Sequence, residues 1–358
     1  MIKYKAILLT FVFGLLGSIL PVQASSHTHE EDKPIDVKEI IFDHIGDAYE
    51  WHVTTIGDKH VSIPLPVIVF SKEKGFHTFL SHKLHHGESH KGFHIATEGA
   101  HKGKVVETIA SGEVVRPLLD LSLTKIAAGI VINSLLLVAI ILCVSRWYRR
   151  KEASDEAPRG FVGAMEMLIM AIYDGIIKPS VGKDYERFAP YLLTAFFFIF
   201  LSNLMGLVPF FPGGANVTGN IAITLFLAVC TFLAVNLFGT REYWREVLWP
   251  EVPVWMKCPV PLMPLIEIFG LITKPFALTV RLLANIMAGH SVILALVCII
   301  FITHSMGALI GGSMTVVSVL FTIFMNFLEL LVAFIQAYVF TMLSAVFIGM
   351  ARVEHHKE

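Results

Sequence analysis

Charged residues are scarce in this sequence. Asp, Glu, Lys and Arg make up 16% of the 358 residues, whereas 55% are hydrophobic. A soluble domain of this length needs far more charge to cover its surface. The composition therefore excludes a soluble globular protein and predicts an integral membrane protein.

Cysteine is also scarce, with four residues and no pair at the CxxC spacing. Three of the four lie inside apolar runs, and Cys258 lies at the edge of one. We therefore expect no disulfide framework, no thiol redox chemistry and no cysteine-bound metal.

The first 24 residues have the layout of a cleavable secretory signal. Lys3 and Lys5 precede an apolar stretch over residues 6–20, and small residues follow near Ala24. Such a segment is removed after export, so we expect a mature chain that begins near Ser25, outside the cytoplasm. An uncleaved first membrane span is the alternative.

Residues 25–120 are polar and predict a small exported domain, which holds 12 of the 16 histidines. Residues 48–70 alternate apolar and polar side chains around Gly57 and Asp58. This alternation predicts a β-hairpin, so we expect the domain to be partly β.

Residues 121–358 are expected to form an all-α membrane domain. Residues 126–145 carry no charge and are long enough to cross a hydrocarbon layer of roughly 30 Å. Residues 188–240 also contain no Asp, Glu, Lys or Arg, but Pro and Gly residues around Pro212 divide them into two spans. Basic residues follow both segments, which places these helix ends in the cytoplasm.

The segment 160–180 predicts an amphipathic helix rather than a span. Its apolar residues recur at helical spacing, and Glu166 and Asp174 interrupt the remainder. We expect this helix to lie on the membrane surface.

The last hundred residues predict a hairpin of two very long helices. Apolar runs cover residues 259–303 and 314–351, with a Gly-rich break between them. At 1.5 Å per residue the second run would be about 57 Å long, so it must tilt steeply or extend beyond the bilayer. With the three earlier spans, this hairpin gives about five membrane helices and a cytoplasmic C-terminus.

Ionisable residues inside this hairpin are the strongest functional signal. Between residues 282 and 351, Glu329 is the only residue among Asp, Glu, Lys and Arg. An Arg at mid-membrane costs about 2.5 to 3.5 kcal/mol, so such charges are functional by default. Glu267, Lys274 and Arg281 are spaced seven apart, which aligns them on one face of a helix.

Three polar side chains, at His290, Glu329 and Gln336, suggest a path across the membrane. His290 lies on the opposite face from Arg281, about 13 Å further toward the outside. Glu329 and Gln336 are seven apart on the second helix. If the two helices are antiparallel, Gln336 falls near the depth of Arg281, and Glu329 falls nearer to His290. The pattern predicts two offset polar half-paths, one from each side, separated by a fixed positive charge.

These polar residues also have a structural interpretation. Glu267 and Lys274 would form an interfacial ion pair, and His290 and Glu329 would form a buried tie. Arg281 does not fit this interpretation, because no carboxylate lies within four positions of it on its own helix. We expect its counterion on another chain. A fixed guanidinium lowers the pKa of a carboxyl group that approaches it, so that group would release its proton there.

The hairpin resembles the a subunit of F-type ATP synthases, the stator half of a proton-driven rotary motor. The motifs that carry the resemblance are PLIEIFGLITKPFALTVRLLANIMAGH, LELLVAFIQAYVFTMLSAVFIGMA and LSNLMGLVPF. The first motif includes R-x-x-x-N-x-x-A-G from Arg281 to Gly289. The resemblance covers about residues 115–354 and gives no role to the polar region before them.

The resemblance implies that protons enter through an outer half-channel, neutralise a carboxylate on a rotating ring of c subunits, and leave to the cytoplasm. Arg281 would separate the two half-channels, with Asn285 and Gln336 beside it. His290 and Glu329 would form the access-side pair. Some bacterial relatives have the acid first and the imidazole second, whereas this chain has the mitochondrial order.

The same resemblance implies the partners and the location. The partners are the c-subunit ring, the b-subunit stalk and the rest of the complex, in the lipid of a bacterial inner membrane. The chain would be a non-catalytic subunit with no cofactor, metal or nucleic-acid partner, and Glu267 and Lys274 would belong to the cytoplasmic-side path. The coupling ion, H⁺ or Na⁺, stays open because the ion-binding carboxylate is on another chain.

A histidine-rich tract supports a rival function. His82, His86, His90 and His94 recur at four-residue steps, which would stack metal ligands on one helix face. Gly87 weakens a helix there, and such tracts are only compositional evidence for metal. A solvated, pH-responsive extension is the preferred interpretation, and a histidine-rich divalent-metal transporter is the alternative function.

Overall fold

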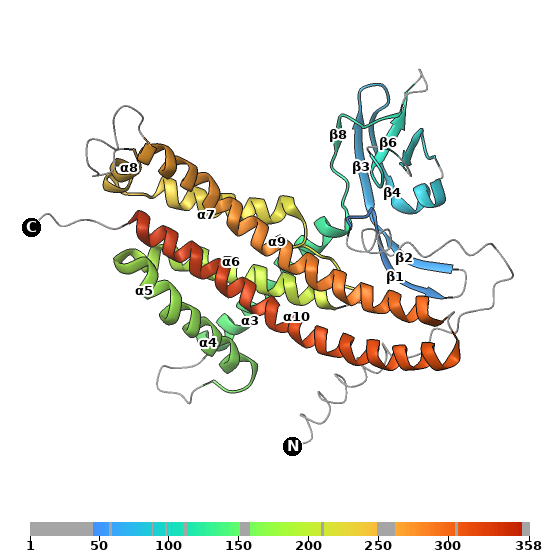
Figure 1. Ribbon diagram of the computed structural model, residues 1–358. Coiled ribbons are helices and arrows are strands. Elements are labelled where there is room, and N and C mark those ends of the chain that lie inside the picture. The colour runs from blue at the N-terminus through green and yellow to red at the C-terminus, as the bar shows by residue number, and fades with distance from the viewer. Residues whose placement is uncertain are drawn as a thin grey trace, which may run out of the picture. The chain divides into compact units, whose positions relative to one another are not determined.

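A computed structural model gives the architecture of the chain (Figure 1). It describes residues 46–56, 59–87, 89–96, 99, 101–109, 114–150, 158–208, 211–248, 262–304 and 307–352. The predicted signal segment and the Gly57–Asp58 turn lie outside the described residues, so both stay predictions. The side-chain contacts reported below lie within one compact unit, Asp36–Val53 together with Ser62–Glu358, whereas Thr54–Val61 belong to a second unit.

The membrane domain is helical, as predicted. Its long helices are α3 (Lys125–Arg149), α6 (Tyr185–Leu207), α7 (Ile221–Leu237), α9 (Leu262–His304) and α10 (Ala308–Ala351). Among the described residues, four helices are long and apolar enough to cross a membrane, or five if the bent pair of α7 and α8 (Arg241–Leu248) is one span. The prediction of a multi-pass membrane protein with about five membrane helices is confirmed at this level.

The C-terminal hairpin is longer than its apolar runs suggested. Helices α9 and α10 have 43 and 44 residues and run side by side (Figure 1). The predicted Gly-rich break was too wide, because α10 begins at Ala308 and includes Gly311 and Gly312. A glycine inside a helix is unfavourable by only about 1 kcal/mol relative to alanine, so an apolar helix can continue through two of them.

Residues 161–181 are helical, as predicted. They form α4 (Phe161–Ile172), the π-helical turn η2 (Tyr173–Ile177) and α5 (Lys178–Val181), and η3 (Gly182–Asp184) leads into α6. Helix α5 touches α10 so closely that a Cβ added at Gly349 would lie 1.9 Å from the Ser180 carbonyl oxygen. This close approach requires glycine and fixes the segment against the hairpin.

The N-terminal region contains short strands, which confirms the prediction of a partly β structure. Strands β1 (Glu50–Ile56) and β2 (Lys59–Pro64) pair in the predicted hairpin. A second sheet has the order β4-β3-β8, from β3 (Pro66–Ser71), β4 (Gly75–Leu80) and β8 (Leu119–Asp120). A third has the order β5-β6-β7, from β5 (Phe93–Ile95), β6 (Val105–Thr108) and β7 (Val114–Val115).

Two cores stabilise these parts. The β region buries Val67, Val69, Phe93 and Val105 in one apolar cluster. The largest cluster joins α6, α7, α9 and α10 with the 161–181 segment. Burial of apolar side chains is the main favourable contribution to such packing, at roughly 25 cal/mol per Å² removed from water.

Candidate functional site

The hairpin brings His290 of α9 against Glu329 of α10. Nδ1 of His290 contacts Oε1 of Glu329, although the two residues are 39 positions apart. The Glu329 residue is only 5% exposed. The sequence predicted that Glu329 lies near the depth of His290, and the structure brings the two side chains into contact. An imidazole and a carboxyl group in contact can exchange a proton.

A small pocket of about 10 Å³ adjoins this pair. It is lined by residues of α6, the α6–α7 loop, α9 and α10. The lining residues are Ser202, Asn203, Gly206, Leu207, Asn216, Thr218, Ile286, His290, Glu329 and Ala333. Two buried polar atoms of the lining, Oε2 of Glu329 and Nδ2 of Asn216, have no hydrogen-bond partner. Buried polar groups are normally satisfied. A water molecule could donate a hydrogen bond to Oε2 of Glu329 and accept one from Nδ2 of Asn216.

Side-chain hydrogen bonds hold the wall of this pocket in place. The Thr218 hydroxyl donates to Oδ1 of Asn203 at 2.6 Å, and Nδ2 of Asn203 donates to the Ala333 carbonyl at 3.1 Å. Behind them, Nδ2 of Asn133 on α3 donates to the Ser202 hydroxyl at 3.3 Å. One polar chain thus links α3, α6, the α6–α7 loop and α10.

The sequence analysis missed these uncharged lining residues. Ser202 and Asn203 lie within the motif LSNLMGLVPF, and Asn216 and Thr218 lie in the uncharged turn. The available signal was a pair of adjacent polar residues inside an otherwise apolar helix. It was not decisive because uncharged polar side chains are common in membrane helices.

A glycine allows the close approach of α9 to Glu329. A Cβ added at Gly289 would lie 3.0 Å from Oε1 and 3.3 Å from Cδ of Glu329. Such distances are shorter than nearly all real Cβ contacts. The Ala288–Gly289 pair of the sequence motif therefore has a packing reason next to the acid.

Arg281 and Asn285 occupy a different face of α9, and both are exposed. Arg281 forms no ion pair with any residue that the structure describes. No hydrogen bond joins it to Gln336, which is only 7% exposed on α10. The structure therefore supplies Arg281 with no carboxylate of its own chain in the described ranges.

Both long helices expose large apolar side chains. On α9 they include Phe276, Val280 and Val292. Helix α10 exposes further ones, at Leu320, Phe324, Phe327, Leu331, Tyr338 and Met342. The exposed Arg281 thus belongs to a hairpin that also exposes many large apolar side chains.

Glu267 and Lys274 form the ion pair that the structural interpretation predicted. Nζ of Lys274 lies 4.0 Å from Oε1 of Glu267, and both side chains are partly exposed. Nζ of Lys274 also lies 5.8 Å from the ring centre of Phe347.

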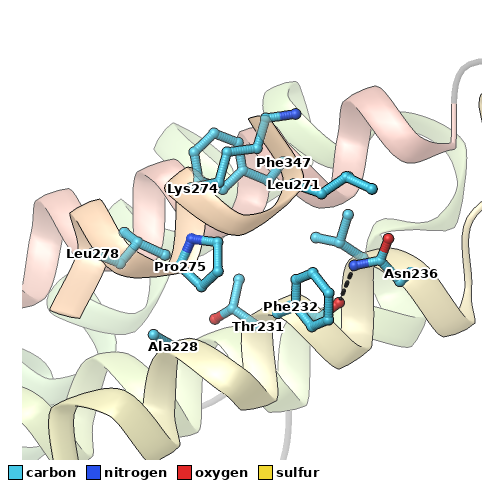
Figure 2. A pocket seen from close by; sticks show the side chains of 10 residues that line it. Ala228, Thr231, Phe232, Asn236, Leu271, Lys274, Pro275, Leu278 and Phe347 are labelled. Carbon is cyan, nitrogen blue, oxygen red and sulfur yellow. Dashed lines mark hydrogen bonds between the residues drawn. The ribbon is translucent and has the colours of Figure 1, made fainter. Parts of the chain in front are cut away.

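Lys274 also lines a second pocket, between α7, α9 and α10 (Figure 2). There Nδ2 of Asn236 donates to the Phe232 carbonyl at 2.8 Å, whereas Oδ1 of Asn236 is buried without a partner. The lining is otherwise largely apolar. Arg281 does not line this pocket.

The histidine tract does not form one helix face, which corrects the four-step spacing argument. His82 lies in the 3₁₀ helix η1 (Ser81–Gly87), His90 forms an isolated bridge with Phe93, and His94 lies in β5. The His86 side chain is outside the described residues. Within the part of the chain that is described, no three His, Cys, Asp or Glu side chains are grouped to hold a metal ion.

Comparison with known proteins assigns two parts of the chain. The family described as ATP synthase A chain matches residues 131–349. A domain family described as being of unknown function matches residues 40–121. The resemblance seen in the sequence is thereby confirmed, and the metal-transporter alternative finds no support.

Individual relatives agree with this assignment. ATP synthase subunit a 2 of Chlorobaculum tepidum is 43% identical over 238 residues, which cover 65% of this chain and 64% of that protein. ATP synthase subunit a of Chlorobium phaeobacteroides is 40% identical over 258 residues, which cover 69% of this chain and 72% of that protein. The chain thus spans slightly less than two thirds of the Chlorobaculum protein. It belongs to the ATP synthase A chain family.

Proposed function

We propose that this chain is the a subunit of an F-type ATP synthase and that it carries protons through two offset half-channels. The observation that carries the proposal is the exposed Arg281, which has no carboxylate partner in the described part of its own chain. Placing a permanent cation in an apolar surface is unfavourable. A mobile carboxylate on a c-subunit ring provides the missing counterion.

Proton entry is assigned to the pocket around His290 and Glu329. Its cavity of about 10 Å³ is at the lower limit for one water molecule, and Asn203, Asn216 and Thr218 in its lining offer that water hydrogen-bond partners. A proton that arrives through this water binds the unpartnered Oε2 of Glu329 or the imidazole of His290. The pair then passes the proton to a deprotonated ring carboxylate, which becomes neutral and can enter the lipid.

Arg281 prevents direct passage between the two half-channels. A guanidinium keeps its charge at physiological pH, so it repels a proton that moves along the interface. It also lowers the pKa of the ring carboxylate that approaches it, which releases the proton to the cytoplasmic side. Asn285, exposed on the same face of α9, and Gln336 are assigned to positions beside this exchange.

Glu267 and Lys274 are assigned to the cytoplasmic-side path. Both side chains are partly exposed near the start of α9, where an ion pair can exchange protons with water. The ion pair itself also supports a purely structural role. Neutral variants of Glu267 or Lys274 would slow proton release strongly if the pair belongs to the path, and only weakly if its role is structural.

The topology follows from the distribution of charge. Basic residues after α3 and α7 place those helix ends in the cytoplasm, so the α6–α7 loop and residues 25–120 lie outside. The signal segment 1–24 is cleaved, and the helix over 161–181 lies on the membrane surface. The chain resides in a bacterial inner membrane with the c-ring, the b-subunit stalk and the rest of the synthase, and its C-terminus is cytoplasmic.

The test replaces Arg281 in the whole synthase and measures two quantities in membrane vesicles. Arg281→Ala abolishes ATP synthesis and, after removal of the catalytic sector, increases passive proton leak, because the barrier between the half-channels is gone. Arg281→Lys retains a positive charge and is the matched control, with a smaller leak. ATP synthesis at the wild-type rate in Arg281→Ala would refute the proposal. Pumping that requires Na⁺ would identify sodium as the coupling ion instead.

A further inference from the structure

The α6–α7 loop, residues 211–220, has two faces with different partners. Asn216 and Thr218 line the pocket that contains His290 and Glu329. Ala215 and Val217, the residues that alternate with them, belong to a separate apolar cluster. All four loop residues are buried. What holds the apolar side of this loop therefore also sets where the polar side chains point.

Trp51 of the N-terminal domain binds the apolar side of the loop. It is 2% exposed, and its Nε1–H donates a hydrogen bond to the Gly213 carbonyl at 3.2 Å, across 162 residues of sequence. The indole ring meets the edge of Phe211 at a centroid distance of 5.3 Å. Trp51 and Leu65 complete the apolar cluster with Ala215 and Val217.

Helix α3 closes the same cluster from another direction. A Cβ added at Gly129 would lie 2.7 Å from Cβ of Ala215 and 3.2 Å from Cγ2 of Val217. The loop therefore packs directly on the α3 backbone and has no space to move toward it.

The N-terminal domain also fixes the start of α3. The backbone N–H of Lys125 donates to the Ala48 carbonyl at 2.7 Å, and that of Ile126 donates to Oδ1 of Asp47 at 3.1 Å. These bonds satisfy donors that a helix leaves unpaired at its N-terminus. Residues 47–51 thus bind both α3 and the α6–α7 loop, the two elements that pack against each other in this cluster.

We infer that Trp51 is a positioning residue for proton entry, through which the N-terminal domain holds Asn216 and Thr218 against the His290–Glu329 pair. The inference rests on the proposed function, and it gives the domain of residues 40–121 a role within that function. A shift of the loop by one residue would turn Ala215 and Val217 toward the acid and move the polar groups into the apolar cluster. The Thr218–Asn203 hydrogen bond would then be lost.

The test uses Trp51→Phe in the whole synthase in membrane vesicles. This variant keeps an aromatic ring but removes the indole N–H together with part of the bicyclic ring system. The Gly213 carbonyl therefore loses its partner, and some apolar contact in the cluster is lost as well. Loss of one such hydrogen bond shifts a conformational equilibrium by about tenfold. Trp244→Phe, at an exposed position in α8, is the matched control.

Two readouts separate positioning from a general loss of stability, after normalisation to assembled synthase. One is the dependence of ATP synthesis on the pH outside, whose midpoint reports the groups that take up the proton. The other is the rate at which a small cationic thiol reagent, added outside, labels Asn216→Cys in a background without the four native cysteines. We expect Trp51→Phe to shift the midpoint and to change the labelling rate about tenfold, and Trp244→Phe to change neither.

The outcomes decide between the alternatives. If Trp51→Phe assembles and both readouts equal those of the wild type, the positioning role is wrong, whereas the proposed function stands as long as Arg281→Ala abolishes synthesis. If Trp51→Phe does not assemble, Ala215→Gly tests the same apolar cluster from the loop side, and unchanged readouts there also overturn the inference. A wild-type synthase that moves no protons would contradict the proposed function itself.

A double-variant cycle gives an independent check. Thr218→Val removes the hydroxyl that reaches Asn203 and keeps the shape of the side chain. If Trp51 acts through the loop, the losses in Trp51→Phe and Thr218→Val do not add, because either change already releases Thr218 from its position. Multiplicative losses in rate would show that Trp51 acts elsewhere, which would overturn the inference.

Discussion

The close contact between Gly289 and Glu329 makes a quantitative prediction for Gly289→Ala. The added Cβ would lie 3.0 Å from Oε1, 3.3 Å from Cδ and 3.5 Å from Cγ of Glu329. Ordinary van der Waals contact begins near 3.4 Å, so the carboxyl group must move by a few tenths of an ångström. It cannot move freely, because Glu329 is 5% exposed and already contacts His290.

The magnitude follows from the distortion that this movement requires. Turning a side chain about 30° from a rotamer minimum costs on the order of 0.5 to 1.5 kcal/mol. If all of this strain energy is added to the activation barrier for proton uptake, the rate of proton uptake falls by about twofold to tenfold. The protein still folds, since alanine is favoured over glycine in a helix by about 0.5 to 1 kcal/mol.

The assay is the initial rate of ATP-driven acidification of membrane vesicles, normalised to assembled synthase. Gly270→Ala is the matched control, because Gly270 lies on the same helix and a Cβ there would meet no atom within 4 Å. We expect Gly270→Ala to pump at the wild-type rate and Gly289→Ala to pump about twofold to tenfold more slowly. Equal rates in the two variants would refute the reasoning.

Three further predictions concern ionisable groups. Glu329→Gln slows proton uptake and changes the pH dependence of ATP-driven pumping, and an unchanged pH profile would count against an access role. Glu267→Gln lowers the free energy of unfolding by less than about 1 kcal/mol, because the contact of Glu267 with Lys274 is long and partly exposed. If this variant reduced the pumping rate more than tenfold, Glu267 would belong to the proton path and not only to a structural ion pair. Burial and the neighbouring Lys83 lower the pKa of His90 below 6.5. The folded state therefore binds fewer protons than the unfolded state, and stability that is present above about pH 6.5 is lost as the pH falls. Hydrogen exchange in β5 and β6 should become faster at low pH in the wild type, and the increase should be smaller in His90→Gln.

The membrane helices were predictable because lipid imposes simple rules. A charge-free run of about 20 residues must satisfy its backbone groups internally, so it forms a helix. Residues 126–145 lie entirely inside α3, and the divided run over 188–240 gave α6 and α7. The ends were less predictable. The start of α10 lies at Ala308 because glycines that end a soluble helix can be accommodated in an apolar one.

The His290–Glu329 contact was predictable, whereas the rest of its pocket was not. Antiparallel helices place residues at similar distances from the turn side by side. The predicted break between residues 303 and 314 put His290 and Glu329 at similar distances, and both residues were conspicuous as ionisable groups. Asn203 and Thr218 carry no charge, and their role depends on how the α6–α7 loop folds back. Periodicity gives no information about such a loop.

The contact of Trp51 with Gly213 was beyond sequence reasoning for a similar reason. It joins residues 162 positions apart through one indole N–H and a backbone carbonyl. A backbone carbonyl leaves no signature in the sequence, and the tryptophan alone is ordinary in a β-hairpin. The histidine tract misled in the opposite way, since its regular spacing is conspicuous but its residues lie in different elements.

Arg281 and Glu329 show opposite solutions to the same problem of charge inside a membrane domain. Glu329 is buried beside His290, so its own chain supplies it with a polar partner. Arg281 is exposed and has no ion pair in the described part of the chain, so its own chain leaves the cost of that cation, about 2.5 to 3.5 kcal/mol or more, without compensation. Only a neighbouring carboxylate can offset this cost, and a fixed one would never leave. In the proposed function, a carboxylate that moves away and is replaced by the next one keeps the cation paired while it carries protons. The proposal thus links the stability of this helix to rotation of a partner.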